Sequence, residues 1–328
     1  MARALLVALA AALGACASTG SGAGRAPEAL AAAESAWLLP WGSGPGQVGH
    51  RATQPEGQGE GAPAVAVGPD GHVFVLDRLN GRVLEIATPA GPPVEVASVP
   101  DDVEDLSVGP DGALAVYSPV RAKVWLKEAG RDAGEVTIPR VLREARGILL
   151  GGSRQVFVHT AYQESYRAGS PAALRSLASV LASRQEGEFL LPTGEGLAVR
   201  VVGGQAELDV IREQERAEVV ARHAIPGPAL AARVVGATGG VACVRLDQPA
   251  SHAPGQAVAI DRRVVCLDVV SGRVVLERGL PAPGWYVPRR EVAMGGGSAP
   301  RLALLHPEKE GLRVFTLAVP PSRSGGKP

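Results

Sequence analysis

Four carboxylates within five residues form the densest group of possible ligands in this chain. They are Asp101, Asp102, Glu104 and Asp105, interrupted only by Val103. Carboxylate oxygens are ligands that Ca²⁺ prefers, so this acidic run could hold a calcium ion or contact a cationic partner. The alternative is a solvated acidic loop, because runs of like charge usually face water.

The histidines and the common catalytic motifs give no second site. No two histidines stand at a spacing typical of metal ligands, and the sequence has no Gly-x-Ser-x-Gly elbow, phosphate-binding loop or Cys-x-x-Cys pair. Asp70 and Asp111 each lie between proline and glycine, where a turn explains an aspartate. We therefore expect no catalytic residue, no metal ligand and no cofactor, apart from the possible Ca²⁺ at the acidic run. The six histidines are His50, His72, His159, His223, His252 and His306.

The N-terminus has the order of charge and hydrophobicity of an export signal. Arg3 is followed by an apolar run over residues 4–13, which is too short to span a bilayer as a permanent helix. This run ends in Leu13-Gly14-Ala15-Cys16, which resembles the lipobox of bacterial lipoproteins. The resemblance implies that residues 1–15 are a signal peptide, cleaved before Cys16, and that the sulfur of Cys16 is acylated. An ordinary signal peptide with a cysteine at the cleavage site is the alternative.

The residues that follow Cys16 favour a protein held on a tether at the membrane. Residues 16–36 are rich in Ser, Gly and Ala and predict a flexible linker. Ala17 stands where an aspartate would favour retention at the inner membrane of enteric bacteria. The resemblance therefore implies a lipid-anchored protein of the bacterial cell envelope, at the outer membrane.

Export bears on the two remaining cysteines, because oxidising compartments favour disulfides. Cys243 and Cys266 lie on two apolar segments that could form a hairpin around the loop near Pro254. Facing positions on that hairpin would allow a disulfide, and two buried free thiols are the alternative.

The composition excludes one class of partner and favours one fold class. The chain has 33 basic and 33 acidic residues and no net charge, so it lacks the basic surface that nucleic acids require. It is 46% hydrophobic with only 4% aromatic residues, and it contains 42 Gly and 27 Pro. Many short strands and turns suit this composition better than long helices do.

A repeated stretch shows how those strands are organised. Residues 65–87 alternate apolar and other residues as half-buried strands do, with turns at Pro69-Asp70-Gly71 and at Asn80-Gly81, a two-residue hairpin signal. The central strand of this unit recurs at intervals of 41, 42, 41 and 44 residues, and a weaker sixth copy follows 61 residues later. The six central strands begin at Val73, Leu114, Val156, Leu197, Val241 and Leu302.

A period near 40 residues with about four strands per unit is typical of the blades of a β-propeller. We therefore predict an all-β fold over residues 37–319, with six four-stranded antiparallel blades and a disordered tail at 320–328. A seventh blade is possible if residues 37–47 form their own sheet instead of adding one strand. The acidic run precedes the first strand of the second unit, so we expect it at the mouth of the ring.

The third unit departs from the pattern. Ser170-Pro171 is a helix-start signal, and Ala172, Leu174, Leu177, Val180 and Leu181 could share one face of a helix. Outer strands are the alternative, and we prefer them because the blade would otherwise lose its outer half.

Several motifs of the first unit resemble NHL repeats. They are Gly44-Pro45-Gly46-Gln47, the Pro69-Asp70-Gly71 turn, Val73-Phe74-Val75-Leu76-Asp77 and Asn80-Gly81-Arg82-Val83. The match is fair in the second unit and faint in the others. The resemblance implies a six-bladed propeller but no single activity, since this fold hosts scaffolds and enzymes alike.

Two hypotheses about function follow. The first is an envelope lipoprotein whose non-catalytic propeller binds a protein, peptide or glycan, with the membrane contacted through the lipid anchor. The second is a metal-dependent hydrolase or lyase of the lactonase type. Lactonase-type propellers hold a divalent ion with Glu, Asn and Asp from several blades, and Asn80 is the only asparagine here. The sequence leaves the oligomeric state open.

Overall fold

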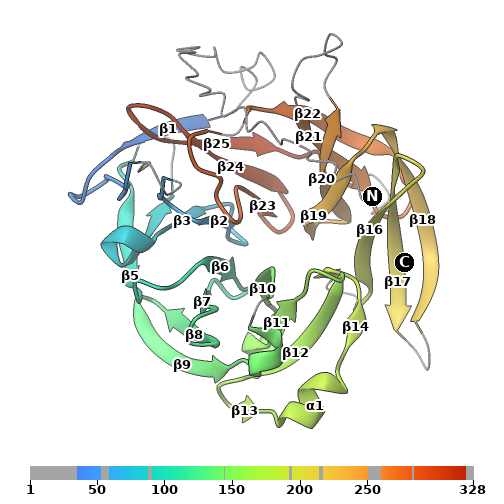
Figure 1. The fold of residues 1–328 in the computed structure, drawn as a ribbon, viewed down its shortest axis with the longest axis horizontal. Coiled ribbons are helices and arrows are strands. Elements are labelled where there is room, and N and C mark those ends of the chain that lie inside the picture. The colour runs from blue at the N-terminus through green and yellow to red at the C-terminus, as the bar shows by residue number, and fades with distance from the viewer. Residues whose placement is uncertain are drawn as a thin grey trace, which may run out of the picture.

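The chain folds into six antiparallel sheets arranged around a central axis (Figure 1). The computed structural model describes residues 35–52, 59–87, 91–143, 145–191, 194–213, 217–249, 260–282 and 284–322. The predicted six-bladed β-propeller is therefore confirmed. The signal peptide, Cys16 and most of the predicted tether lie outside the described residues.

Blades 1 to 3 follow one another along the chain. Blade 1 contains β2 (Ala64–Val67), β3 (Val73–Asp77), β4 (Arg82–Ile86) and β5 (Val94–Ser98). Blade 2 contains β6 (Asp105–Val108), β7 (Leu114–Ser118), β8 (Lys123–Glu128) and β9 (Arg131–Thr137). Blade 3 contains β10 (Gly147–Leu150), β11 (Val156–His159), β12 (Glu164–Ser170), β13 (Ala173–Leu174) and β14 (Gln185–Glu186).

Blades 4 to 6 complete the ring. Blade 4 contains β15 (Phe189–Leu190), β16 (Gly196–Val202), β17 (Gln205–Glu213) and β18 (Ala217–Pro228). Blade 5 contains β19 (Ala231–Thr238), β20 (Val241–Pro249), β21 (Ile260–Asp268) and β22 (Val274–Leu280). Blade 6 contains β23 (Val292–Gly295), β24 (Arg301–Pro307), β25 (Gly311–Ala318) and β1 (Ser35–Pro40).

The first and last strands of the ring meet in blade 6. β1 runs antiparallel to β25, from Ser35 opposite Thr316 to Pro40 opposite Gly311. This pairing closes the circle with main-chain hydrogen bonds between the two ends of the domain. The possibility of a seventh blade at residues 37–47 is wrong, because this segment supplies only the outermost strand of blade 6.

The inner strands are buried on both faces, which corrects the expectation of half-buried strands. Val65, Val67, Val73 and Val75 pack against blade 6. The alternate residues Ala64, Ala66, Phe74 and Leu76 pack instead against blade 2. Alternate residues of these strands therefore face two neighbouring blades, and neither face of the sheet is exposed to water.

The turn between the first two strands has the geometry that Pro-Asp-Gly predicts. In blade 1, Asp70 Oδ1 accepts a hydrogen bond from the amide of His72, and Gly71 has a φ of +86°. In blade 2, Asp111 Oδ1 accepts one from the amide of Ala113. These contacts explain both aspartates as turn residues.

The Asn80-Gly81 turn is longer than the two-residue hairpin expected from sequence. Asp77 pairs with Arg82, so four residues form the loop, three of them in a 3-10 turn and the last, Gly81, left-handed at φ +66°. Asn80 donates instead to the Asp77 carboxylate and to the carbonyl of Gly42, which lies 38 residues earlier. The side chain of Asn80 is thus held by a tertiary contact, and the expected two-residue turn is replaced by a four-residue loop.

Blade 3 contains both a helix and strands where the sequence left the choice open. The helix α1 (Leu177–Leu181) lies at the rim, between the short outer strands β13 and β14 (Figure 1). It begins after Ser176, whose side chain accepts from the amide of Ser179. The predicted start at Ser170 is wrong, because Ser170 belongs to β12. Only Val180 of the helix is buried.

Cys243 and Cys266 face each other directly on β20 and β21. Their sulfurs form a disulfide, and both residues are fully buried. Of the predicted tail, residues 320–322 lie inside the described part, and Ser322 contacts Asp268. Within the described residues, no helix has the length and hydropathy needed to cross a membrane.

Asp77 is a buried junction between blade 1 and the segment after β1. Its carboxylate accepts from Arg82 Nε at 2.9 Å, from Asn80 at 2.8 Å and from the amide of Gly49 at 2.9 Å. We expect Asp77→Ala to lower the free energy of unfolding by about 3–5 kcal/mol, because a nearly buried guanidinium loses its partner. Urea denaturation followed by tryptophan fluorescence measures this loss.

Asp132→Ala is the matched control for this prediction. Asp132 pairs with Lys127 at the surface, and its side chain is 77% exposed. Because exposed ion pairs contribute little, this variant should lose at most about 1 kcal/mol. Equal losses in the two variants would contradict the structural role of Asp77.

Candidate functional site

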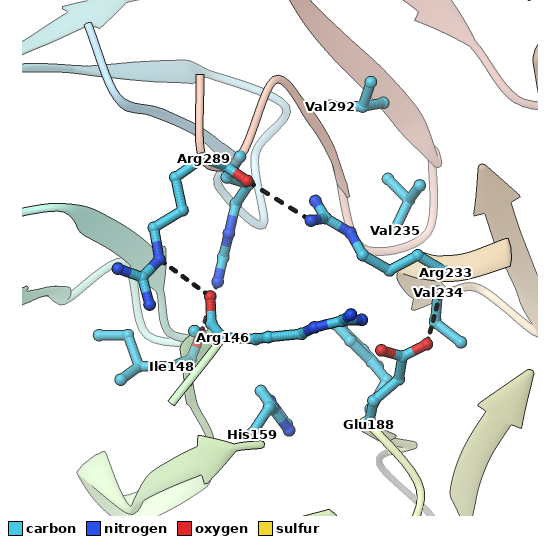
Figure 2. Close-up of a pocket in the computed structure, with 12 residues that line it drawn as sticks. Arg146, Ile148, His159, Glu188, Arg233, Val234, Val235, Arg289 and Val292 are labelled. Carbon is cyan, nitrogen blue, oxygen red and sulfur yellow. Dashed lines mark hydrogen bonds between the residues drawn. The ribbon is translucent and has the colours of Figure 1, made fainter. Parts of the chain in front are cut away.

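One mouth of the ring is surrounded by arginines. It lies where the chain enters the innermost strands, and a cavity of about 440 Å³ opens there. Four arginines and one aspartate line this cavity, which we call the arginine vestibule; they are Arg146, Arg233, Arg245, Arg289 and Asp247. A smaller recess of about 60 Å³ continues past Arg146 and Arg233 to Arg290, His159 and Glu188 (Figure 2).

Arg290 reaches across the axis and links blades. Its main chain pairs with Pro63 and Val65 of blade 1. Its guanidinium donates to the carboxylate of Asp105 at 2.7 Å and to the carbonyls of Leu106 and Ile148, which belong to blades 2 and 3. Asp105 also accepts from the amide of Ile148 at 2.8 Å. This buried pair is therefore structural, and both members are engaged.

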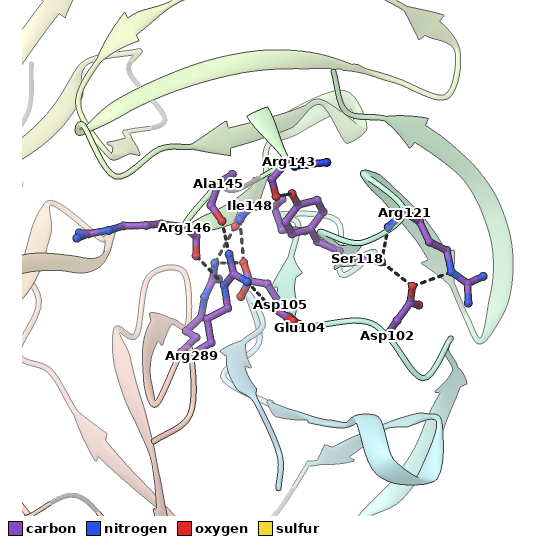
Figure 3. A network of polar contacts seen from close by, with 12 residues as sticks. Asp102, Glu104, Asp105, Ser118, Arg121, Arg143, Ala145, Arg146, Ile148 and Arg289 are labelled. Carbon is purple, nitrogen blue, oxygen red and sulfur yellow. Dashed lines mark hydrogen bonds and ion pairs between the residues drawn. The ribbon is translucent and has the colours of Figure 1, made fainter. Parts of the chain in front are cut away.

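Arg289 is fixed in a similar way at the edge of the vestibule. It forms an ion pair with Glu104 and donates to the carbonyls of Ala145 and Arg146 (Figure 3). These contacts join the segment before blade 6 to the segments before blades 2 and 3. The charge of Arg289 is largely offset by Glu104.

Arg245 also has partners. Asp247 accepts two hydrogen bonds from its guanidinium, at 2.9 and 3.0 Å, and Glu291 accepts a third at 2.6 Å. Glu291 is shared with the buried Arg262, at 2.7 and 2.8 Å. Two arginines and two carboxylates thus form one network on the side of the vestibule near blades 5 and 6.

Arg146 and Arg233 differ from these three arginines. Within the described part of the chain, neither forms a salt bridge with a carboxylate. Arg233 makes one long hydrogen bond, at 3.5 Å, to the carbonyl of Arg289. Glu188 is the nearest compensating charge, but its carboxylate accepts from the amide of Val234 at 2.8 Å. Among the described residues, Arg146 and Arg233 are therefore the two arginines of the vestibule that form no salt bridge with a carboxylate.

The pKa shifts at this mouth follow from burial and crowding. Burial raises the pKa of the Glu188 carboxyl, while the Val234 amide and the charges of Arg233 and Arg146 oppose this. Burial also lowers the pKa of the Arg233 guanidinium; the charges of Arg245 and Arg290 act in the same direction, and those of Glu188 and Glu291 oppose it. Positive charges crowd one another around Arg233.

His159 and Ser165 are close enough to suggest a nucleophile and its base, but their hydrogen bonds point elsewhere. Ser165 Oγ lies 2.6 Å from the carbonyl of Gly187, to which it must donate its proton. In the hydrogen bond of 2.8 Å between these two side chains, His159 Nδ1 is therefore the donor and Ser165 Oγ is the acceptor. Ser165 is fully buried, so the pair holds blade 3 together and does not activate a hydroxyl.

The acidic run is divided between two places. Glu104 and Asp105 lie at the mouth, as expected, and bind Arg289 and Arg290. Asp102 lies apart from them and accepts from Arg121 at 2.7 Å and from Ser118 (Figure 3). Asp101 also lies near Arg121, at 3.7 Å. The structure therefore does not bring the four carboxylates together. No group of three or more possible metal ligands occurs among the described residues.

Sequence reasoning missed the arginines, although a signal was present. Arg146 directly precedes the innermost strand β10, Arg289 and Arg290 lie two to three residues before β23, and Arg233 lies near the start of β19. This is the position that placed the acidic run at the mouth, and the same rule applied to every blade would have found them. Arg245, on a second strand, carries no such signal.

The opposite mouth has a different character. A cavity of about 530 Å³ lies there, lined mainly by the glycine- and proline-rich turns after the innermost strands and by apolar side chains such as Phe157, Phe189 and Met294. Arg167 lies over the ring of Phe157, 5.7 Å from its centroid. Of the two mouths, the arginine vestibule therefore carries more charged side chains.

Comparison with known proteins adds the fold alone. No family model and no curated protein matches this sequence. Similar solved structures include hydrazine synthase from Kuenenia stuttgartiensis, at 15% identity and a TM-score of 0.41 over 75% of this chain and 76% of that chain. A Bacteroides caccae protein of unknown function is similar at 16% identity and 0.43, over 67% and 81%. Virginiamycin B lyase from Staphylococcus aureus is similar at 14% and 0.35, over 80% and 86%. Likeness at this level carries no conclusion about activity.

His159 should make the stability of this protein depend on pH. Burial, assisted by the charge of Arg290, lowers the pKa of His159 from 6.5 to about 3. Between these values the unfolded chain binds a proton that the folded protein does not. The free energy of unfolding therefore falls as pH falls below about 6.5, by up to about 1.4 kcal/mol per pH unit from this group.

The measurement compares the wild type with His159→Gln by urea denaturation between pH 4.5 and 7.5. The variant should lose this part of the slope, while His50→Gln, at an exposed position, should keep it. A wild-type slope that is unchanged in His159→Gln would contradict the burial of a neutral imidazole.

Proposed function

We propose that this chain is a bacterial envelope lipoprotein whose propeller is a non-catalytic scaffold that binds a protein, peptide or glycan. The lipid anchor would be Cys16, followed by the tether to the outer membrane. The ligand would bind at the arginine vestibule.

The observation that carries the proposal is the vestibule itself. Its cavity of about 440 Å³ lies within the size range of ligand sites and receives side chains from several blades. Two of its arginines have no carboxylate partner among the described residues, so they can contact a ligand without breaking a salt bridge. Ser165 and His159 form a serine–histidine pair beside the vestibule. The hydroxyl of Ser165 donates its proton to a backbone carbonyl and not to the histidine.

Two resemblances in the sequence support the proposal. The Leu13-Gly14-Ala15-Cys16 motif is similar to a lipobox, and the motifs of blade 1 are similar to NHL repeats. Several acyl chains on one cysteine would anchor the protein stably, whereas a single chain binds a membrane only marginally. A tethered propeller would then present its vestibule to other molecules of the envelope.

Cys16→Ser tests the anchor. In cells fed an alkyne fatty acid, the wild-type chain should become labelled and remain with the outer-membrane fraction. The variant should lose the label and the membrane association, because it lacks the acylated sulfur. Cys243→Ser is the matched control, and it should retain both. Equal labelling of Cys16→Ser and the wild type would disprove acylation at this residue.

A photo-crosslinking residue tests the binding surface in cells. Placed at Ala231, which is exposed and lines the vestibule, it should give a defined adduct with an envelope component. Placed at Val94, which is 58% exposed on the outer strand of blade 1, it should not. No adduct from Ala231, or the same adduct from both positions, would refute ligand binding at the vestibule.

A further inference from the structure

We propose that the arginine vestibule binds an oxyanion, a phosphate or carboxylate group of the ligand, between Arg146 and Arg233. This inference rests on the proposed function, because it names the chemical group that the vestibule recognises. A guanidinium presents a planar fork of donors that matches both groups, and two such forks can hold one anion from two sides.

The positions of the two arginines suit this role. Arg146 precedes β10 of blade 3, and Arg233 lies on β19 of blade 5, so they approach the vestibule from different blades. In Figure 2 the side chain of Arg146 extends toward Glu188, and the side chain of Arg233 extends toward the main-chain carbonyl of Arg289. Both also line the small recess below, so an anion between them would lie where the vestibule narrows.

The other charges at this mouth are already engaged. Among the cations, Arg245 is paired with Asp247 and Glu291, and Arg289 is paired with Glu104. Among the carboxylates, Asp247 is held by Arg245, whereas Glu188 accepts from a backbone amide and also interacts electrostatically with Arg146 and Arg233, without a salt bridge to either. The paired groups fix the walls, and Arg146 and Arg233 remain as donors for an incoming anion.

The crowding of positive charge gives a physical reason for an anion to bind. Burial and the charges of Arg245 and Arg290 disfavour the protonated state of Arg233, and the charges of Glu188 and Glu291 offset this in part. An anion between Arg146 and Arg233 would reduce this repulsion and would also satisfy donors that point into the cavity. In a site partly shielded from water, such charge-assisted hydrogen bonds are stronger than at an open surface.

The size of the vestibule fits an anionic group together with part of a larger molecule. A cavity of about 440 Å³ is within the size range of small-molecule sites. A phosphate or carboxylate would occupy only the narrow end. The remaining volume could accept the adjoining part of the ligand, such as a sugar ring or a peptide residue.

The experiment is isothermal titration calorimetry of the full-length protein in a neutral detergent, with inorganic phosphate and with acetate as separate probes. Chloride keeps the ionic strength constant, because screening alone weakens any charge interaction. We expect saturable binding of at least one probe to the wild type. Binding of phosphate alone would assign a phosphate-bearing ligand, binding of acetate alone a carboxylate-bearing ligand, and binding of both the shared chemistry.

Arg146→Gln and Arg233→Gln should each weaken binding roughly ten- to a hundredfold, because each removes charge-assisted hydrogen bonds to the anion. Arg131→Gln is the matched control, since Arg131 is an exposed arginine on β9 of blade 2, away from the vestibule. It should bind as the wild type does. Thermal unfolding in chloride verifies that each variant is folded.

Absence of binding of both probes to the wild type would overturn the oxyanion site, and so would wild-type affinity in both vestibule variants. These outcomes are separable from failure of the proposed function. A specific adduct from Ala231 without anion binding would retain the scaffold and refute the oxyanion site. Anion binding that depends on Arg146 and Arg233, without an adduct in cells, would support the site and refute the scaffold.

Discussion

Each sheet of this protein has two apolar faces and can cover neither of them alone. The alternating residues of β2 and β3 show this directly, because one set packs on blade 6 and the other on blade 2. A row of such sheets would leave two apolar faces in water, whereas a ring leaves none. The pairing of β1 with β25 completes that ring, and the rest of the structure depends on this closure.

Closure also determines where charge accumulates. The innermost strands all start at the same mouth, so residues that precede them in six distant parts of the sequence meet there. Buried arginines at such a place need partners, and Arg289, Arg290 and Arg245 obtain them from Glu104, Asp105 and Glu291. These pairs link blades 2, 3, 5 and 6 across the axis. Among the described residues, Arg146 and Arg233 form no salt bridge with a carboxylate.

The two mouths differ because different parts of the repeat form them. Entry segments, which vary from blade to blade and carry charged residues, form the arginine vestibule. Tight turns rich in glycine and proline form the opposite mouth, together with apolar side chains such as Phe157 and Met294. The repeat that builds the fold thus supplies a nearly constant apolar end and a variable polar end.

The sequence by itself determined the ring. The recurring Val73, Leu114 and Val156 strands and the Asp70 and Asp111 turns follow from local patterns of period and turn chemistry. For Cys243 and Cys266 the sequence left a disulfide and two free thiols open, and the structure places them on facing positions. Only the tertiary structure decided which charges are paired. Arg290 forms an ion pair with Asp105, which is 185 residues away in the sequence. The side chain of Asn80 donates to the carbonyl of Gly42, outside the turn to which Asn80 belongs. The conformation of the turn depends on such distant contacts, which no local pattern encodes. The same holds for the lack of a carboxylate partner for Arg146 and Arg233 among the described residues.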